Sequence, residues 1–279
     1  MANDDMILLK KDKRNPAVGV LSLNRPEAGN AFNTPMLMQL SAKLDEIEND
    51  HNIRAMILMS EGPNSSFGAD LNELVIKTEE GYKNIRYKEA YAHLMDGRQV
   101  VRKLFNLRVP VVGLMKGFTL GGGAEIYLMC DILYGASGSK KEGGLMFGFP
   151  EATIGVMAGW MGPEAMVRKI GSATAIDIFC TGKMVDAEEA LTQGIIRKAV
   201  PVDQLYEEGF AWADMITKNA PCAVESTRRT VKRVAFPDFE QWIETTAKET
   251  IDNLLTEDFV LGAKKILERE KAQPEYHRK

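Results

Sequence analysis

Residues 117–125 read Gly117-Phe118-Thr119-Leu120-Gly121-Gly122-Gly123-Ala124-Glu125, so three consecutive glycines open an expected helix (122–129) and a carboxylate follows at once. A short apolar run at 110–115 precedes them and predicts a strand. Backbone N–H groups without side-chain cover can approach a ligand oxygen, and the helix dipole favours negative charge there. The stretch therefore predicts a strand followed by a helix, with a functional site at the junction beside Glu125.

Two further stretches are assigned to the same site. Phe147-Gly148-Phe149-Pro150-Glu151 supplies a second carboxylate, 26 positions after Glu125. Ser65-Ser66-Phe67-Gly68-Ala69-Asp70-Leu71 lies at another expected strand-to-helix junction and can offer a second backbone N–H to the same oxygen. Two N–H donors and two acids predict chemistry on a carbonyl compound.

Composition narrows the class of protein. The chain has 279 residues with 45% hydrophobic content, enough for one large domain or for a core with an appendage. The net charge of −4 is spread over 35 basic and 39 acidic residues without long single-sign runs. This pattern argues against nucleic acid or an anionic membrane as the main partner.

The cysteines and histidines predict neither a disulfide framework nor a metal site. Cys130, Cys180 and Cys222 are far apart, and the three histidines have no partners at ligand spacing. The start of the chain, residues 1–6, is acidic and unlike a signal or transit peptide, and no run of eighteen apolar residues occurs. These features predict a cytoplasmic protein that binds no metal.

Expected strands alternate with expected helices along the first 200 residues, which predicts an α/β architecture with its site at strand ends. Strands are expected at 6–10, 18–23, 55–59, 110–115, 132–135, 145–149 and 195–200, and helices at 34–47, 69–75, 79–107, 122–129 and 187–193. Residues 201–279 contain four helical blocks, at 202–219, 221–235, 239–255 and 257–271. Because these blocks are too apolar for a solvated tail, we expect a core at 1–200 and a helical, oligomer-forming region at 201–279.

Several motifs in register carry a family resemblance over about residues 6–205. They are Leu23-Asn24-Arg25-Pro26 with Asn30-Ala31, Gly68-Ala69-Asp70-Leu71, Gly121-Gly122-Gly123-Ala124-Glu125 with Cys130-Asp131, Pro150-Glu151 with Gly155, Thr181-Gly182, and Glu189-Ala190 with Gly194. With these motifs the chain resembles the enoyl-CoA hydratase/isomerase (crotonase) family.

The resemblance implies a crotonase-like spiral of ββα units, with a C-terminal helical region that builds trimers commonly paired into hexamers. It implies an acyl-CoA thioester as substrate and no cofactor besides the substrate's own CoA. The N–H groups of Ala69 and Gly122 match the oxyanion hole, and Glu125 and Glu151 match the two acids that activate water and protonate Cα. Residues expected to contact the substrate are Ala28, Phe67, Gly68, Asp70, Leu71, Gly121, Gly159 and Trp160.

Retention of both acids favours hydration of a 2-enoyl-CoA to a 3-hydroxyacyl-CoA. Two carboxylates whose pKa values are pushed apart can divide the roles of base and acid. An isomerase, or a hydrolase or decarboxylase of the same family, remains open because the oxyanion hole is shared. A non-catalytic acyl-CoA binding subunit is the alternative from another class. Asp70 has a second interpretation as a helix cap.

The chain departs from the family pattern in two places. The family spaces its acids about twenty positions apart, whereas the loop 137–144 adds about six residues here, an insertion that costs little entropy. We expect this loop to be mobile and to leave Glu151 in place. In addition, Gly159-Trp160-Met161 replaces small residues beside the acyl pocket, where the Gly159 N–H would help to orient water. Trp160 and Met161 predict a branched, cyclic or aromatic acyl group.

Overall fold

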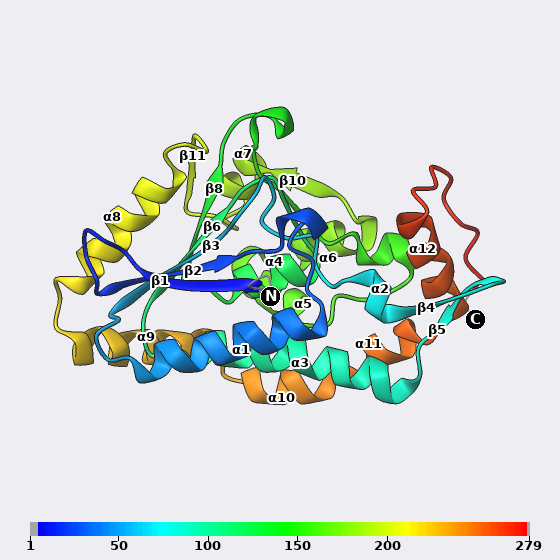
Figure 1. Ribbon diagram of the computed structural model, residues 1–279, viewed down its shortest axis with the longest axis horizontal. Coiled ribbons are helices and arrows are strands. Elements are labelled where there is room, and N and C mark those ends of the chain that lie inside the picture. The colour runs from blue at the N-terminus through cyan, green and yellow to red at the C-terminus, as the bar shows by residue number, and fades with distance from the viewer. Residues whose placement is uncertain (1–4, 278–279) are drawn as a thin grey trace.

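A six-stranded sheet forms the body of the protein (Figure 1). The computed structural model describes residues 5–277. The strands of the sheet, in spatial order, are β1 (Ile7–Lys11), β2 (Val18–Leu23), β3 (Ala55–Ser60), β6 (Val111–Met115), β8 (Ile132–Ala136) and β11 (Lys198–Val200). β1 is antiparallel to β2, and all other neighbours are parallel. The central strands β3 and β6 are almost wholly apolar and buried, as expected of a parallel sheet covered on both faces.

A second, smaller sheet carries the glycine-rich segments. Its strands, in spatial order, are β10 (Met184–Asp186), β9 (Met146–Gly148) and β7 (Phe118–Leu120). Isolated bridges extend it, because Ser66 pairs with Thr119 and Phe32 pairs with Ala69. The segments around residues 66–69 and 119–122 therefore run side by side, although they are far apart in sequence.

From β6 to β9, successive strands alternate between the two sheets. β6 of the large sheet leads into β7 of the small sheet and then into helix α4 (Gly122–Leu128), and β8 leads into β9 in the same way. The chain thus repeats a strand–strand–helix unit. This alternation is the spiral of ββα units that the family resemblance implies.

Helices cover the sheet and close the site. In Figure 1, α1 (Thr34–Asn49) and α3 (Tyr87–Asn106) lie side by side along the lower face, and α8 (Leu205–Thr217) lies at the opposite end from α12 (Glu257–Leu267). Asn33 caps α1 by accepting a hydrogen bond from the Met36 N–H at 2.9 Å. The remaining helices are α2 (Leu71–Leu74), α5 (Gly162–Ile170), α6 (Ser172–Thr181), α7 (Ala187–Thr192), α9 (Pro221–Ala235), α10 (Phe239–Thr245) and α11 (Ala247–Leu254), with short 3₁₀ turns η1 (Pro26–Ala28), η2 (Lys140–Glu142) and η3 (Pro150–Ile154).

Several predicted bounds are wrong. The helix expected at 69–75 is a single turn, α2, which gives way to a hairpin of β4 (Val75–Thr78) and β5 (Gly81–Asn84), so the next helix begins at Tyr87 rather than at 79. Gly81 has φ +131°, a conformation that a helix cannot contain. The block 239–255 is divided into α10 and α11, and α12 ends at Leu267. β7, α5, α6 and β10 were not predicted.

The last helices pack against the body. α11 contacts α3, and α12 contacts η3 and β5. Leu254 and Phe259 are buried there, whereas Leu261 and Ile266 stay exposed. Within residues 5–277, no helix is long and apolar enough to cross a membrane.

Candidate active site

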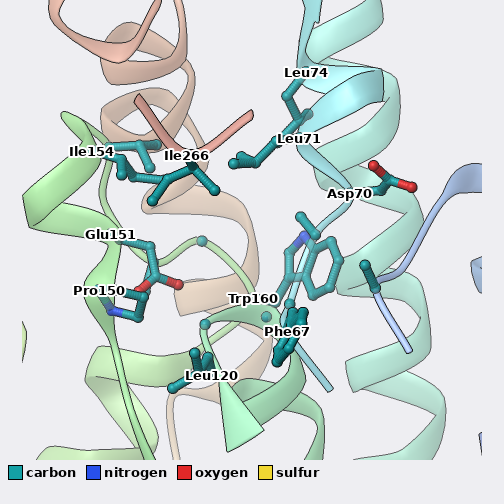
Figure 2. A pocket seen from close by; sticks show the side chains of 18 of the residues that line it. Phe67, Asp70, Leu71, Leu74, Leu120, Pro150, Glu151, Ile154, Trp160 and Ile266 are labelled. Atoms are coloured by element: carbon teal, nitrogen blue, oxygen red, sulfur yellow. The ribbon is translucent and has the colours of Figure 1, made fainter. Parts of the chain in front are cut away.

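A cavity of about 590 Å³ lies where the glycine-rich segments of the small sheet face α3, α11 and α12 (Figure 2). Every residue that the sequence predicts for the site lines this cavity: Glu125, Glu151, Ala69, Gly122, Ala28, Phe67, Gly68, Asp70, Leu71, Gly121, Gly159 and Trp160. The structure therefore brings together residues spread over more than 130 positions of the chain, from 28 to 160. Figure 2 shows Glu151 and Trp160 on facing sides of the cavity.

Glu125 is buried and held by two backbone amides. Its Oε1 accepts hydrogen bonds from the N–H groups of Trp160 at 2.7 Å and Gly162 at 2.6 Å. A Cβ on Gly162 would lie 2.8 Å from the same oxygen, so glycine lets the backbone approach the carboxylate. These contacts fix the carboxylate in one orientation.

Glu151 lies at the start of η3 and keeps part of its side chain open to the cavity. Its Oε1 sits against Gly121, whose φ is +52° and whose Cβ, if present, would lie 2.6 Å away. Its buried Oε2 has no hydrogen-bond partner among the described residues. A buried carboxylate oxygen without a partner is unfavourable unless a ligand or water supplies one, so this atom is suited to contact substrate.

Burial raises the pKa of both carboxyls, but by different amounts. Burial raises the pKa of Glu125 to about 7, opposed by the two backbone N–H donors and by the Arg98 cation. Burial, together with the negative charge of Glu125, raises the pKa of Glu151 to about 8. The N–H donors of Trp160 and Gly162 stabilise an ionised Glu125, whereas the buried Oε2 of Glu151 has no donor, so the geometry favours ionisation of Glu125 and a proton on Glu151.

Two backbone N–H groups are available beside these acids. Phe32 donates its N–H to the Gly68 carbonyl at 2.8 Å and accepts from the Asp70 N–H at 2.9 Å. Since successive N–H groups of an extended chain point to opposite sides, the Ala69 N–H faces away from Phe32. Gly68, at φ +91°, lies so close that a Cβ would be 3.1 Å from the Gly122 nitrogen, so the segments carrying the Ala69 and Gly122 amides lie against each other.

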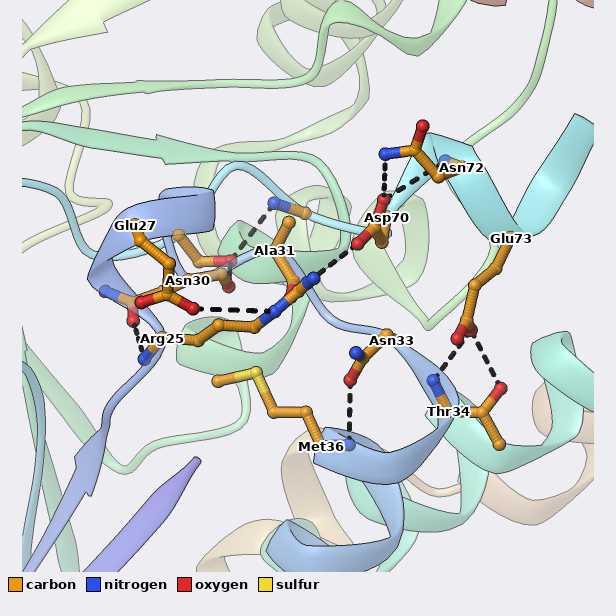
Figure 3. Close-up of polar contacts among 12 residues, drawn as sticks. Arg25, Glu27, Asn30, Ala31, Asn33, Thr34, Met36, Asp70, Asn72 and Glu73 are labelled. Atoms are coloured by element: carbon orange, nitrogen blue, oxygen red, sulfur yellow. Dashed lines mark hydrogen bonds and ion pairs between the residues drawn. The ribbon is translucent and has the colours of Figure 1, made fainter. Parts of the chain in front are cut away.

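Asp70 holds the loop that carries Ala69. It accepts hydrogen bonds from Arg25 at 2.7 Å and from the Asn72 N–H at 3.1 Å, and Arg25 also donates to the Ala31 carbonyl (Figure 3). Burial opposes ionisation of Asp70, but these hydrogen bonds outweigh it and lower its pKa. The helix-cap interpretation of Asp70 is confirmed, although its carboxyl also borders the cavity.

Comparison with known proteins identifies the family of the chain. The model of the enoyl-CoA hydratase/isomerase family matches residues 13–278. The chain belongs to the enoyl-CoA hydratase/isomerase family. Its relatives include a short-chain-enoyl-CoA hydratase of Clostridium acetobutylicum, 34% identical over 84% of this chain and 83% of that protein. A probable enoyl-CoA hydratase of Mycobacterium tuberculosis is 32% identical over 82% of both chains. A crystal structure of an enoyl-CoA hydratase from Mycobacterium avium subsp. paratuberculosis shares the fold, with a TM-score of 0.82 and 18% identity over 98% of both chains.

Two large residues depart from the family pattern, Trp160 and Met161, and only one of them lines the cavity. Trp160 lines the cavity, where its ring covers Gly122 so closely that a Cβ there would lie 2.5 Å away, and it meets Phe32 edge to face with the ring centroids 6.1 Å apart. Met161 is buried in the core and does not line the cavity. The prediction that both side chains reshape the acyl pocket is therefore corrected, because only Trp160 reaches it.

The loop 137–144 closes on itself. Ser139 and Glu142 cap η2 reciprocally, and the Leu145 N–H donates to the Ala136 carbonyl at 2.8 Å, so the two ends of the loop meet. Glu151 accordingly lies in the cavity in spite of the insertion. Lys140 of this loop lies 4.3 Å above the ring of Phe118, which itself contacts Phe67 at the cavity wall.

Sequence reasoning missed two polar residues of the site region. His93 on α3 is buried against Trp160 and lines the cavity, and Arg98, also on α3, is 1% exposed and donates from Nε to the Gly159 carbonyl at 2.8 Å. Their signal was a histidine and an arginine on the apolar face of one helix, at a spacing of five residues. Among the described residues, no group of three or more His, Cys, Asp or Glu side chains could hold a metal ion.

Proposed function

We propose that the protein is an enoyl-CoA hydratase, which adds water to the double bond of a 2-enoyl-CoA and yields a 3-hydroxyacyl-CoA. The observation that carries the proposal is the pair of carboxyls in one cavity, Glu125 held by two N–H donors and Glu151 with an unpartnered Oε2, next to two backbone N–H groups. Relatives named as enoyl-CoA hydratases support it. Hydration needs both a base and an acid, which is what this pair can supply.

The proposed reaction assigns one role to each group. Glu125, the first acid to ionise, takes a proton from water while the water oxygen forms a bond to Cβ. The electron pair of the double bond moves toward the thioester, and the N–H groups of Ala69 and Gly122 stabilise the negative carbonyl oxygen of the enolate. Loss of one such donor costs about 3–4 kcal/mol of barrier in a well-studied protease. Glu151 then gives its proton to Cα. Exchange with solvent afterwards removes the proton that Glu125 gained and returns one to Glu151.

The proposal includes a branched, cyclic or aromatic acyl group, because the Trp160 ring lines the cavity and lies against Gly122, one of the two residues assigned to the thioester oxygen. It needs no cofactor besides the CoA of the substrate. Ala28, Phe67 and Leu71, at the cavity wall, would contact the substrate. We also propose a trimer or a dimer of trimers, since large apolar side chains of several helices are exposed on the single chain: Ile176 at 61%, Met215 at 62%, Val231 at 61% and Val234 at 77%.

The test combines a substrate panel with two isosteric variants. Linear, branched, alicyclic and aromatic 2-enoyl-CoA thioesters are incubated with the enzyme, and the products are identified by mass spectrometry. We expect hydration of at least one thioester and its loss in Glu125→Gln and Glu151→Gln, while Glu79→Gln, an exposed carboxyl of the β4–β5 turn, keeps it. Hydration that survives both site variants would refute the mechanism, and crotonyl-CoA as the best substrate would refute the bulky acyl group.

The same panel separates the alternatives. A 3-enoyl-CoA supplied in heavy-oxygen water returns a product without label if the enzyme only shifts the double bond, and a labelled product if it hydrates or hydrolyses. Binding of CoA thioesters without any turnover would identify a non-catalytic binding subunit.

A further inference from the structure

Arg98 is the most deeply buried cation near the site. Its three nitrogens have separate partners: Nε donates to the Gly159 carbonyl at 2.8 Å, Nη2 to the Thr246 hydroxyl at 3.0 Å, and Nη1 to the Ile243 carbonyl. A guanidinium donates through a rigid planar fork, so three partners fix its position. Burying a cation so completely is costly, and no carboxylate makes a direct ion pair with Arg98 among the described residues.

The Gly159 carbonyl and the Trp160 N–H are two ends of one peptide unit. Arg98 donates to the oxygen at 2.8 Å, and the N–H donates to Glu125 Oε1 at 2.7 Å. A cation at the oxygen of a peptide polarises the unit and strengthens the hydrogen bond that its N–H donates. The Arg98 cation and the Glu125 carboxylate are therefore linked through a single peptide group.

Most of the ionisable groups around this link are carboxyls, which carry negative charge when ionised. The charged groups that act on Glu125 are Glu164 of α5 and Arg98 of α3, and Glu125 itself acts on Glu151 of η3. Those that also act on Arg98 are Glu249 of α11 and Tyr91 of α3. Arg98 is the only cation in this described set, and together with the N–H donors of Trp160 and Gly162 it opposes the repulsion that Glu164 exerts on an ionised Glu125.

We propose that Arg98 is a positioning residue that acts on Glu125 through the Gly159–Trp160 peptide and keeps its carboxylate ionised and oriented while Glu151 keeps its proton. The role in turnover rests on the proposed hydratase function. The link itself does not, because it concerns the ionisation of Glu125 in the free protein. Burial raises the pKa of Glu125 to about 7, and loss of the Arg98 cation raises it further.

The direct test measures Glu125 without using turnover. In an E151Q background, the carboxyl stretching band of Glu125 is titrated by infrared difference spectroscopy against E125Q/E151Q, which identifies the band. We expect Arg98→Gln to raise the midpoint by about one pH unit or more, the size of effect that a nearby cation has on a carboxyl. Arg98→Lys, which keeps the charge, should return most of the shift.

Two controls separate positioning from a loss of packing. Arg228→Gln removes another buried arginine, which donates to the Leu104 and Phe105 carbonyls away from the cavity, and should lower stability without moving the midpoint. Thr246→Val removes one anchor of the guanidinium and should give a smaller shift in the same direction, so it serves if Arg98→Gln does not fold. An unchanged Glu125 midpoint in both Arg98→Gln and Thr246→Val would overturn the proposal.

Turnover provides an independent readout on Glu125 and Glu151 in the intact enzyme. If the enzyme hydrates a thioester, the acid limb of its kcat/KM profile should move to higher pH in Arg98→Gln and stay in place in Arg228→Gln. A shifted infrared midpoint in an enzyme that turns over no thioester would leave the Arg98 link standing and refute the hydratase function instead. An unshifted midpoint in an active hydratase would refute the Arg98 link and leave the hydratase function standing.

Discussion

Replacing Glu125 by glutamine should make the protein more stable and less active at once. The amide oxygen of glutamine can accept the same two hydrogen bonds from Trp160 and Gly162, so the geometry is kept while the ionisable group is lost. Burial raises the pKa of Glu125 from 4.5 to about 7, a rise of about 2.5, and each pKa unit corresponds to about 1.4 kcal/mol. The ionised form in the folded protein therefore costs about 3 kcal/mol.

The sign follows from which state binds the proton more tightly. Since the folded protein holds this proton more tightly than the unfolded chain, Glu125 lowers the free energy of unfolding as the pH rises from about 4.5 to about 7, and the loss is complete above that range. Glu125→Gln removes this dependence. The variant should match the wild type near pH 4 and exceed it at pH 8 by up to about 3 kcal/mol, while turnover falls by about 100- to 10,000-fold.

Urea unfolding followed by circular dichroism at both pH values, together with a hydration assay, measures the two effects. Glu79→Gln, a solvent-exposed carboxyl, is the control and should change neither quantity. Equal pH dependence of unfolding in wild type and Glu125→Gln would refute the argument that Glu125 is buried at an energetic cost. Full turnover in the variant would refute its role as the base.

Three other substitutions test separate parts of the site. Gly121→Ala, at φ +52° with its Cβ 2.6 Å from Glu151 Oε1, should displace that carboxyl and reduce kcat with a stability loss of about 1 kcal/mol, and unchanged kcat would count against the placement of Glu151. Trp160→Ala should lower the free energy of unfolding by about 3–5 kcal/mol and broaden the range of acyl groups accepted, as measured by kcat/KM over the thioester panel, so an unaltered preference would remove Trp160 from the acyl wall. Asp70→Asn should lower the free energy of unfolding by about 2 kcal/mol at pH 7 and leave it unchanged at acid pH. The reason is that hydrogen bonds from Arg25 and Asn72 overcome burial, lower the pKa of Asp70 and stabilise its ionised form until the pH falls through that pKa. Urea titrations with equal losses at both pH values would contradict this.

Local patterns predicted the parts of the fold that depend on local chemistry. The apolar runs of β2, β3 and β6 and the start of α1 at Thr34-Pro35 are visible in sequence, because burial and a proline in the first turn leave residue-type signatures. The sequence suggests Thr34 as the cap of α1, but the cap is Asn33. The hairpin at Val75–Asn84 is not visible in sequence, since its strands pair only with each other and contain two lysines and a threonine in place of a regular apolar alternation. Its extended form becomes stable through contacts with α12, which lies about 180 residues further along the chain.

The site shows the same division. Glu125 and Glu151 were predicted because glycine and proline mark the turns that expose them, and their residue types carry the chemistry. Arg98 was not predicted, because its role depends on a carbonyl 61 positions away, and a single arginine in a helix is usually a surface residue. The apolar wall that α11 and α12 add through Leu254, Phe259 and Ile266 is equally invisible until the chain folds back.

The loop at 137–144, which closes on itself, offers a position for attaching a label. A hydrogen bond between Ala136 and Leu145 already joins the two ends of the loop, so a group attached at its tip does not have to be accommodated by separating them. Lys141 at its tip is exposed. A fluorophore or a short epitope placed there should report on the protein in solution or immobilise it on a surface.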